Sequence, residues 1–192
     1  MTTIRPARAD ELDALLAVVR EATRRLESQG IHQWDNIYPD SPTLQADIEN
    51  RHMHVIEAQG AIAGMISLND VQSPEYRDVT WLFPGRALVV HRLVIAPSHQ
   101  RQGHATRLLM FAEQEAKKQG YDTIRFDAFT ENSAATALYG HLGYRTAGTV
   151  KFRKGLFFCF EKPMKTIEAQ GTAEPAGRAH VSPAAGDPSA FP

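Results

Sequence analysis

The alternation of hydrophobic and polar positions along residues 1–165 predicts one domain of mixed α/β type. Apolar residues at three- and four-residue spacing predict amphipathic helices over 10–30, 42–51, 102–120 and 133–142. Short apolar or alternating runs predict strands over 3–8, 54–58, 61–68, 87–95, 123–129, 145–150 and 156–162. The predicted order is β-α-α-β-β-β-α-β-α-β-β. A long polar loop over 69–86 interrupts it, and loops of this length tend to be functional lids or mobile segments.

The most informative stretch is 93–109, LVIAPSHQRQGHATRLL, which reads as the end of a buried strand, a loop and the start of a helix. The first N–H groups of a helix lack intrahelical partners and lie at the positive end of its dipole, so they can donate to a pyrophosphate. Gly103 allows close approach of the anion, and Arg101 adds positive charge. An ordinary strand–loop–helix connection without a ligand is the alternative.

Two sequence motifs together narrow this choice. Residues 100–105, QRQGHA, resemble the acyl-CoA motif of the GCN5-related N-acetyltransferase (GNAT) family, Gln/Arg-x-x-Gly-x-Gly/Ala. Residues 132–144, NSAATALYGHLGY, resemble the second signature of the same family, in which an Asn at a helix start precedes a Leu-Tyr pair and a Gly-aromatic pair. The resemblance covers about residues 2–164.

The resemblance implies a fold and a reaction. The expected fold is a single GNAT-type domain, a mixed and mainly antiparallel twisted sheet of about seven strands with helices on both faces and its central parallel strands splayed into a V. The expected activity is direct transfer of an acetyl group from acetyl-CoA, as co-substrate, to a primary amine of a small molecule, amino acid derivative or peptide terminus. A non-catalytic acyl-CoA-binding sensor is the alternative.

Residues on both motifs are expected to bind acetyl-CoA. In the second motif Asn132, Ala135 and Tyr139 fall at i, i+3 and i+7, so they share one helical face, and small Ala135 would leave room for the pantetheine arm. The full set implied by the resemblance is Leu93, Val94, Ile95, Gln100, Arg101, Gln102, Gly103, His104, Ala105, Thr106, Asn132, Ala135 and Tyr139.

Three chemical roles follow from the reaction that the resemblance implies. Backbone N–H groups near Leu93 and Val94 would polarise the thioester carbonyl, and Tyr139 would donate a proton to the leaving thiolate. A tyrosine packed in the core with its hydroxyl satisfied is the alternative for Tyr139. His91 is the candidate general base because of its near-neutral pKa. A structural role for His91, a water relay or Glu161 are the alternatives for the base.

Aromatic side chains in the more variable segments are candidates for acceptor selection. They are Trp34 and Tyr38 after the first helix and Trp81 in the long loop. The alternative is that these rings only cover the edge of the sheet.

Composition limits the remaining partners. The chain has 192 residues, 43% of them hydrophobic, and a net charge of −1 with scattered Lys and Arg, which predicts neither nucleic-acid nor membrane binding. Its single cysteine, Cys159, lies in an apolar run, which predicts a buried thiol. No targeting segment is recognised in the sequence, and this favours the cytoplasm. His52 and His54 lack further ligands nearby, so no metal site is expected. The sequence leaves a homodimer open, and residues 166–192 are expected to form a disordered Ala/Pro/Gly-rich tail.

Overall fold

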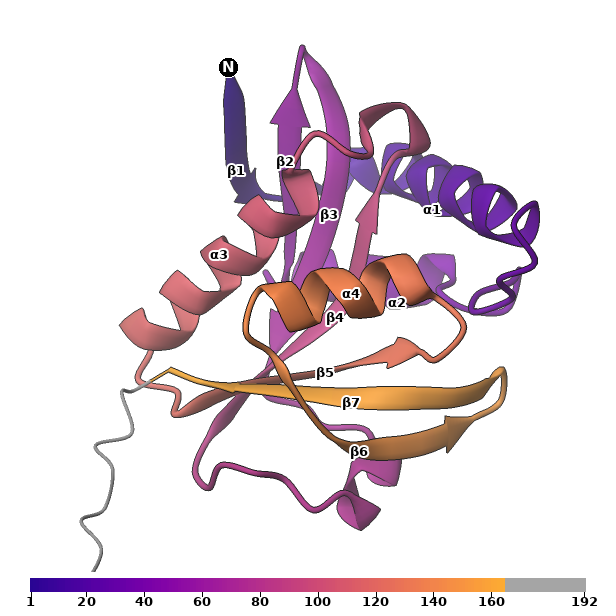
Figure 1. Cartoon of the computed structure of the whole chain (residues 1–192). Coiled ribbons are helices and arrows are strands. Elements are labelled where there is room, and N and C mark those ends of the chain that lie inside the picture. Colours follow the sequence, from indigo (N-terminus) through magenta and orange to yellow (C-terminus); the bar gives the residue numbers. More distant parts are fainter. Residues whose placement is uncertain (165–192) are drawn as a thin grey trace, which may run out of the picture.

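The computed structural model describes residues 1–164, so the predicted tail lies outside the described residues. Figure 1 shows one sheet with helices packed on both of its faces. The strands are β1 (Thr2–Pro6), β2 (Met53–Ala58), β3 (Ala61–Asn69), β4 (Ala87–Ile95), β5 (Thr123–Phe129), β6 (Arg145–Phe152) and β7 (Gly155–Pro163). The α-helices are α1 (Leu12–Glu27), α2 (Ser41–Glu49), α3 (His104–Lys118) and α4 (Ser133–His141).

The sheet has seven strands in the order β1-β2-β3-β4-β5-β7-β6. The β4–β5 pair is parallel and each of the other neighbouring pairs is antiparallel. The mixed, mainly antiparallel sheet expected from the sequence is therefore confirmed. Within residues 1–164, no helix is long and apolar enough to cross a bilayer.

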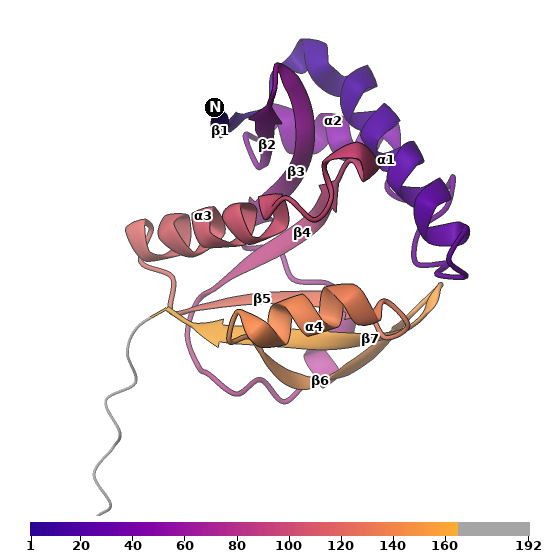
Figure 2. The ribbon, with the colours of Figure 1, turned by 45° about the horizontal axis from the view of Figure 1, so that its top comes forward.

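The two parallel strands separate soon after they pair. Residues Ala87 to Val89 of β4 are in register with Thr123 to Arg125 of β5, but β4 continues to Ile95 and β5 to Phe129 without further pairing. Figure 2 shows β4 leaving β5 at an angle. The splayed V expected from the family resemblance is therefore present, and it opens the middle of the sheet.

A β-bulge in β4 accompanies this divergence. Met65 of β3 faces Val94 and Ser67 faces His91, so Ile66 of β3 has two residues of β4 opposite it. One of the two is Arg92, whose φ is 50°. A bulge bends its strand and redirects a side chain. Here it sends the Arg92 guanidinium to Asp47 of α2, with Nε–Oδ2 and Nη2–Oδ1 distances of 2.5 and 2.7 Å.

Three apolar clusters hold the layers together. Leu108, Leu109 and Ala112 of α3 pack with Tyr139 on one face of the sheet, and Leu15 of α1 belongs to the cluster on the other face. The third cluster lies under the long loop between β3 and β4 and includes Tyr76 and Val79 of that loop. Burial of these side chains packs the central part of the loop against the sheet, and its role as a lid or a mobile segment stays a prediction.

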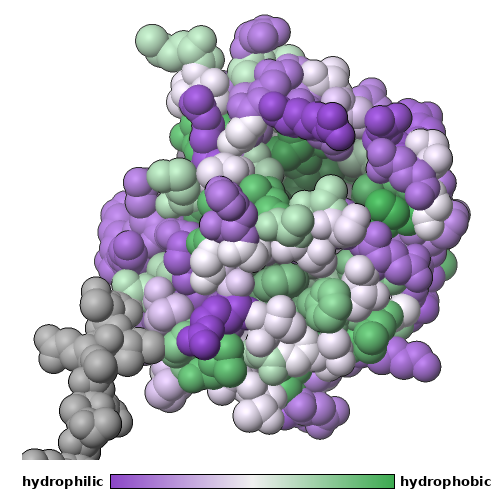
Figure 3. Space-filling model, in the orientation of Figure 1, coloured by the Kyte–Doolittle hydropathy of each residue, from purple (hydrophilic) through white to green (hydrophobic). Residues whose placement is uncertain are grey.

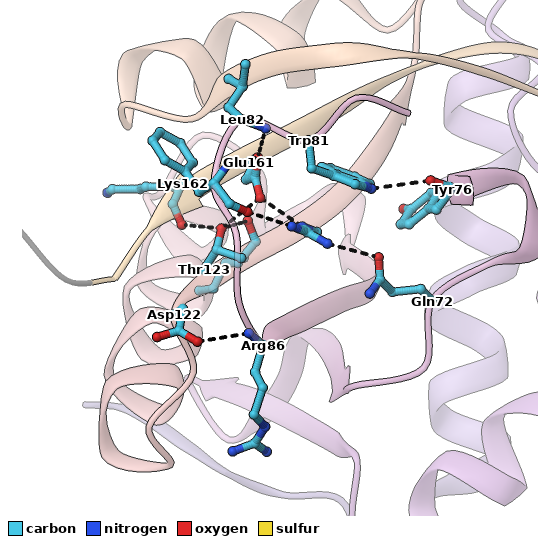
Figure 4. Close-up of polar contacts among 12 residues, drawn as sticks. Gln72, Tyr76, Trp81, Leu82, Arg86, Asp122, Thr123, Glu161 and Lys162 are labelled. Atoms are coloured by element: carbon cyan, nitrogen blue, oxygen red, sulfur yellow. Dashed lines mark hydrogen bonds and ion pairs between the residues drawn. The ribbon is translucent and has the colours of Figure 1, made fainter. Parts of the chain in front are cut away.

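A buried carboxylate also anchors the long loop (Figure 4). Glu161 of β7 has no exposed surface and pairs with Arg125 of β5, Nε to Oε1, at 2.8 Å. Its other oxygen accepts hydrogen bonds from the backbone N–H groups of Leu82 and Phe83 at 2.6 and 3.1 Å. Arg125 in turn donates from Nη2 to the Phe83 carbonyl at 2.8 Å. The pair ties the loop to two strands.

We expect Glu161→Gln to destabilise the fold by about 3–5 kcal/mol, because it leaves the buried Arg125 guanidinium without its counter-ion. Chemical unfolding measures the loss, and limited proteolysis should detect release of the loop over residues 70–86. Glu57→Gln is the control, since Glu57 pairs with Arg5 at a partly exposed position. Equal unfolding midpoints for the two variants would contradict this role of Glu161.

Candidate active site

A cleft of about 1190 Å³ occupies the space between the diverging ends of β4 and β5. Figure 3 shows a hollow with an apolar floor on the face that carries α3 and α4, with hydrophilic residues along its upper edge. The cleft is also lined from the opposite side, by the C-terminal half of α1 and by residues of the 31–38 and 71–76 segments. A molecule held between the strands can therefore be reached from both faces of the sheet.

The loop before α3 forms an open backbone cradle at one end of the cleft. Gly103 precedes the helix with φ 79°, and a Cβ built on it would meet nothing within 4 Å. The first hydrogen bond of the helix runs from the Arg107 N–H to the Gly103 carbonyl at 3.0 Å. The N–H groups of His104, Ala105 and Thr106 precede that bond and are left for a ligand, as an anion site at a helix N-terminus requires.

His104 adds a second feature to the cradle. Its side chain lines the cleft and is 5% exposed, yet neither ring nitrogen has a hydrogen-bond partner among the described residues. Burial lowers its pKa, with smaller contributions from His99 and Arg107. A buried polar group without a partner is costly. Phosphate oxygens bound at the N-terminus of α3 would supply the missing partner.

All but one of the other residues expected on this motif line the cleft. Seven of them line the cleft with Gly103 and His104: Leu93, Val94, Ile95, Gln100, Arg101, Ala105 and Thr106. Gln102 does not line the cleft, because its side chain turns back to donate to the Ser98 carbonyl at 3.2 Å. The prediction that Gln102 binds acetyl-CoA stays a prediction, since this contact engages only its side chain.

Helix α4 presents the second motif to the same cleft. Asn132, Ala135 and Tyr139 all line it, as their helical spacing predicts. Asn132 is the N-cap, with Oδ1 accepting from the Ala135 N–H at 3.1 Å. Its Nδ2 donates to Gln33 Oε1 at 2.9 Å. The amide of Asn132 thus joins α4 to the segment after α1, across the cleft.

The Tyr139 ring is fixed by aromatic contacts. Its centroid lies 4.8 Å from that of Phe126 and 5.4 Å from that of Phe160, both edge to face. The side chain is 8% exposed. Burial raises the Tyr139 pKa, and the charge of Asp127 raises it further, so the hydroxyl stays protonated. A rigid, protonated phenol in the cleft is suited to donate a proton.

His91 lies on the part of β4 that has left β5, and it also lines the cleft. Its Nε2 is 3.0 Å from Asn69 Oδ1. Burial lowers its pKa to about 4, and the neighbouring Arg92 charge contributes. The imidazole is therefore neutral at pH 7 and has a low affinity for a proton.

Asp127 of β5 places a carboxyl group in the cleft, and the sequence analysis missed it. Its Oδ1 accepts a hydrogen bond from the Tyr76 hydroxyl at 2.6 Å. Burial raises its pKa to about 6, and the charge of Glu75 contributes in the same direction. The available signal was an acidic residue between aromatic positions in a buried strand, TIRFDAF.

Two of the three aromatic candidates for acceptor selection line the cleft and the third does not. Trp34 and Tyr38 line the cleft, and Arg92 Nη1 donates to the Tyr38 hydroxyl at 2.9 Å. Trp81 does not line it: its ring lies over the Arg125 guanidinium at 4.5 Å, and its Nε1 donates to the Tyr76 carbonyl at 3.3 Å. Glu161, a candidate base, is likewise buried outside the cleft with Arg125. Trp81 and Glu161 belong to the support of the long loop.

The acetyltransferase (GNAT) family model matches residues 17–144, which include the cradle, Asp127 and the whole second motif. The chain belongs to the acetyltransferase (GNAT) family. It is 23% identical over 147 residues to the uncharacterized N-acetyltransferase YesJ of Bacillus subtilis, covering 74% of this chain and 81% of YesJ.

Solved GNAT structures agree with this fold. A GNAT acetyltransferase of Streptococcus agalactiae superposes with a TM-score of 0.75 at 24% identity, covering 84% of this chain and 95% of that one. The acetyltransferase YncA of Salmonella typhimurium, solved with its cofactor acetyl-CoA, gives 0.65 at 21% identity, covering 92% and 99%. Membership of this family supports an acyl-CoA-dependent N-acyltransferase, as the sequence analysis expects.

We expect Gly103→Val to weaken CoA binding about tenfold or more, because the added side chain enters the cradle in front of the free N–H groups. Calorimetric titration with CoA measures the change. Gly60→Val is a matched control, since Gly60 in the β2–β3 turn has the same φ of 79° and the same open space around a Cβ. Both variants bear similar backbone strain, so equal CoA affinities would contradict the phosphate cradle.

We expect Asp127→Asn to stabilise this GNAT protein at pH 7 by about 2 kcal/mol, because the pKa of Asp127 is raised to about 6 in the folded state. The protonated carboxyl favours folding below the unfolded pKa, and this contribution is lost as the pH rises through about 6. Thermal unfolding from pH 3.5 to 8 measures it. A gain that persists at pH 3.5 would contradict the assignment.

Proposed function

We propose that the protein transfers an acetyl group from acetyl-CoA directly to a primary amine, with both substrates bound in the cleft at the same time. The observation that carries this proposal is the lining of the cleft, which presents the phosphate cradle and Tyr139 from one face of the sheet and Asp127, Trp34 and Tyr38 from the other. Bound acetyl-CoA supplies an activated thioester. The remaining chemistry belongs to residues of this chain.

Unpaired backbone of β4 is proposed to polarise the thioester carbonyl. Peptide groups of a strand point alternately to its two neighbours. Beyond Val89, β4 has β3 on one side and the cleft on the other. N–H groups near Leu93 and Val94 are therefore available to donate to a carbonyl oxygen on which negative charge develops.

Tyr139 is proposed as the general acid for the departing thiolate. The raised pKa keeps the hydroxyl protonated across the neutral range, and the aromatic contacts hold it in one position. A covalent route would need a nucleophile in the cleft. Cys159 has no exposed surface, does not line the cleft, and burial raises the pKa of its thiol to about 12. These features favour direct attack by the amine.

Asp127 is proposed to accept the proton of the ammonium group, in place of His91. A catalytic base works best with a pKa near the operating pH. The pKa of Asp127 is about 6 and that of His91 about 4. The His91 ring is also engaged by Asn69. His91 then contributes to the shape of the cleft as a neutral side chain.

We expect Tyr139→Phe to lower kcat by roughly 10- to 1000-fold while sparing the affinity for acetyl-CoA, since general acid catalysis contributes on this scale. Thiol release assayed over a panel of amines gives kcat, and calorimetry gives the affinity. Unchanged turnover would remove Tyr139 from the mechanism.

We expect kcat/KM to rise with pH through an apparent pKa near 6, because only the ionised Asp127 carboxylate accepts a proton. Asp127→Asn should abolish this limb of the profile and His91→Gln should preserve it. If the limb lies near pH 4 and disappears in the His91 variant, His91 is the base and the role of Asp127 is wrong.

A further inference from the structure

The half of the cleft away from α3 and α4, which we call the acceptor chamber, has an apolar wall. It is bounded by the C-terminal half of α1, by the 31–38 and 71–76 segments and by the tip of the β6–β7 hairpin. Ile31, Trp34, Phe152 and Phe157 line it, and the centroids of the two Phe rings are 5.1 Å apart, edge to face. At its mouth Val71 is 64% exposed. Such a wall accommodates a hydrocarbon or aromatic group.

The inner end of the chamber carries a carboxylate that lacks a counter-ion. Within residues 1–164, Asp127 forms no ion pair, and its hydrogen bond comes from the neutral Tyr76 hydroxyl. Glu75, on the same segment as Tyr76, adds negative charge nearby. A buried carboxylate is stabilised strongly by a cation that replaces lost water. An ammonium group at this position provides one.

The cations around the chamber are largely neutralised by the chain itself. Arg92 is paired with Asp47, and the side chains of both partners are less than 10% exposed, at 9% and 8%. Arg153 donates from Nη1 and Nη2 to the two carboxylate oxygens of Asp35 at 2.8 and 2.9 Å, and Lys154 lies 3.4 Å from the same carboxylate. Arg25, exposed on α1, is left in solvent at the rim. Asp35 balances only one of the two cations that contact it, and the excess positive charge lies at the hairpin tip, where the Arg153 side chain is 53% exposed. Among residues 1–164, no cation forms an ion pair with Asp127 at the inner end of the chamber.

We infer that the acceptor is a primary amine on an uncharged apolar body, with its ammonium group bound between Asp127 and Tyr76, and that the chamber rejects amines bearing a carboxylate beside the amino group. This inference rests on the proposed function, because it assigns the acceptor of the same reaction. The apolar wall binds the body of the acceptor, and the Asp127 carboxylate orients the nitrogen that reacts.

Matched acceptors test the inference. We expect 2-phenylethylamine to exceed phenylalanine in kcat/KM by about 100-fold or more, since the two differ by a carboxylate that would be buried without a partner. 1,4-Diaminobutane, which has no apolar body beyond its methylene chain and carries a second charge, should also be poorer than 2-phenylethylamine. A preference for phenylalanine or for the diamine would overturn the inference.

Binding without turnover separates recognition from catalysis. N,N-Dimethyl-2-phenylethylamine keeps the positive charge but yields no stable amide, and 2-phenylethanol lacks the charge. By calorimetry on the protein saturated with CoA, Asp127→Asn should weaken the tertiary amine about tenfold or more and leave the alcohol unchanged. Equal losses for both ligands would show that Asp127 does not bind the ammonium group.

Two variants test the wall and the neutralised cations. Phe152→Ser should raise the KM for 2-phenylethylamine about tenfold and leave the KM for acetyl-CoA unchanged. Leu156→Ser is the control, because Leu156 lies on the same hairpin but is 47% exposed and does not line the cleft. Asp35→Asn frees Arg153 and Lys154, so it should shift the kcat/KM ratio toward phenylalanine about tenfold. Equal effects of the two hairpin variants, or an unchanged ratio, would contradict the inference.

The outcomes also distinguish this inference from the proposed function. If no amine promotes thiol release although CoA binds, the proposed function fails. If amines are acetylated but charged or polar acceptors are preferred, the proposed function stands and the acceptor inference is wrong.

Discussion

The structure depends on the early end of the pairing between β4 and β5. The two strands share three residues in register, and each then continues alone on its own side of a cleft. The separation removes ladder hydrogen bonds, which are normally satisfied in a buried sheet. It leaves the β4 peptide groups for a substrate. The bulge at Arg92 and the pairing of its guanidinium with Asp47 fix β4 to helix α2.

Most buried charges in the described residues are paired, and two buried ionisable side chains without a charged partner line the cleft. Two buried ion pairs hold segments in place: Glu161–Arg125 fixes the long loop, and Asp47–Arg92 fixes strand β4. Asp127 and His104, by contrast, lack a charged partner, and burial shifts the pKa of each toward its neutral form. Ionisable groups with strongly shifted pKa values cluster at functional sites, where a bound ligand can provide the hydrogen-bond or charge partner that the chain does not. Both residues line the cleft, His104 at the start of α3 and Asp127 on β5.

Polar contacts across the cleft also link its two halves. Asn132 of the second motif donates to Gln33, and Asp35, two residues later, binds the β6–β7 hairpin through Arg153. The segment after α1 is therefore held by both the CoA side and the acceptor side. Because the Asn132 amide nitrogen is engaged by Gln33, a pantetheine arm that bound the same nitrogen would release this segment from α4.

The sequence by itself determined the order of elements, the cradle at Gly103 and the shared face of Asn132, Ala135 and Tyr139, because these features arise from local periodicity and from the geometry of a helix start. Only the tertiary structure decided which charges are paired. It showed that the long loop is packed, that Trp81 and Glu161 support it, that Gln102 turns away, and that Asp127 lies in the cleft. Apart from the local contact of Gln102 with Ser98, these facts depend on contacts between residues 30 or more positions apart, such as Asp127 with Tyr76 and Arg125 with Glu161. Periodicity reports which face of an element is buried, whereas the partner that meets that face is set by how the elements pack.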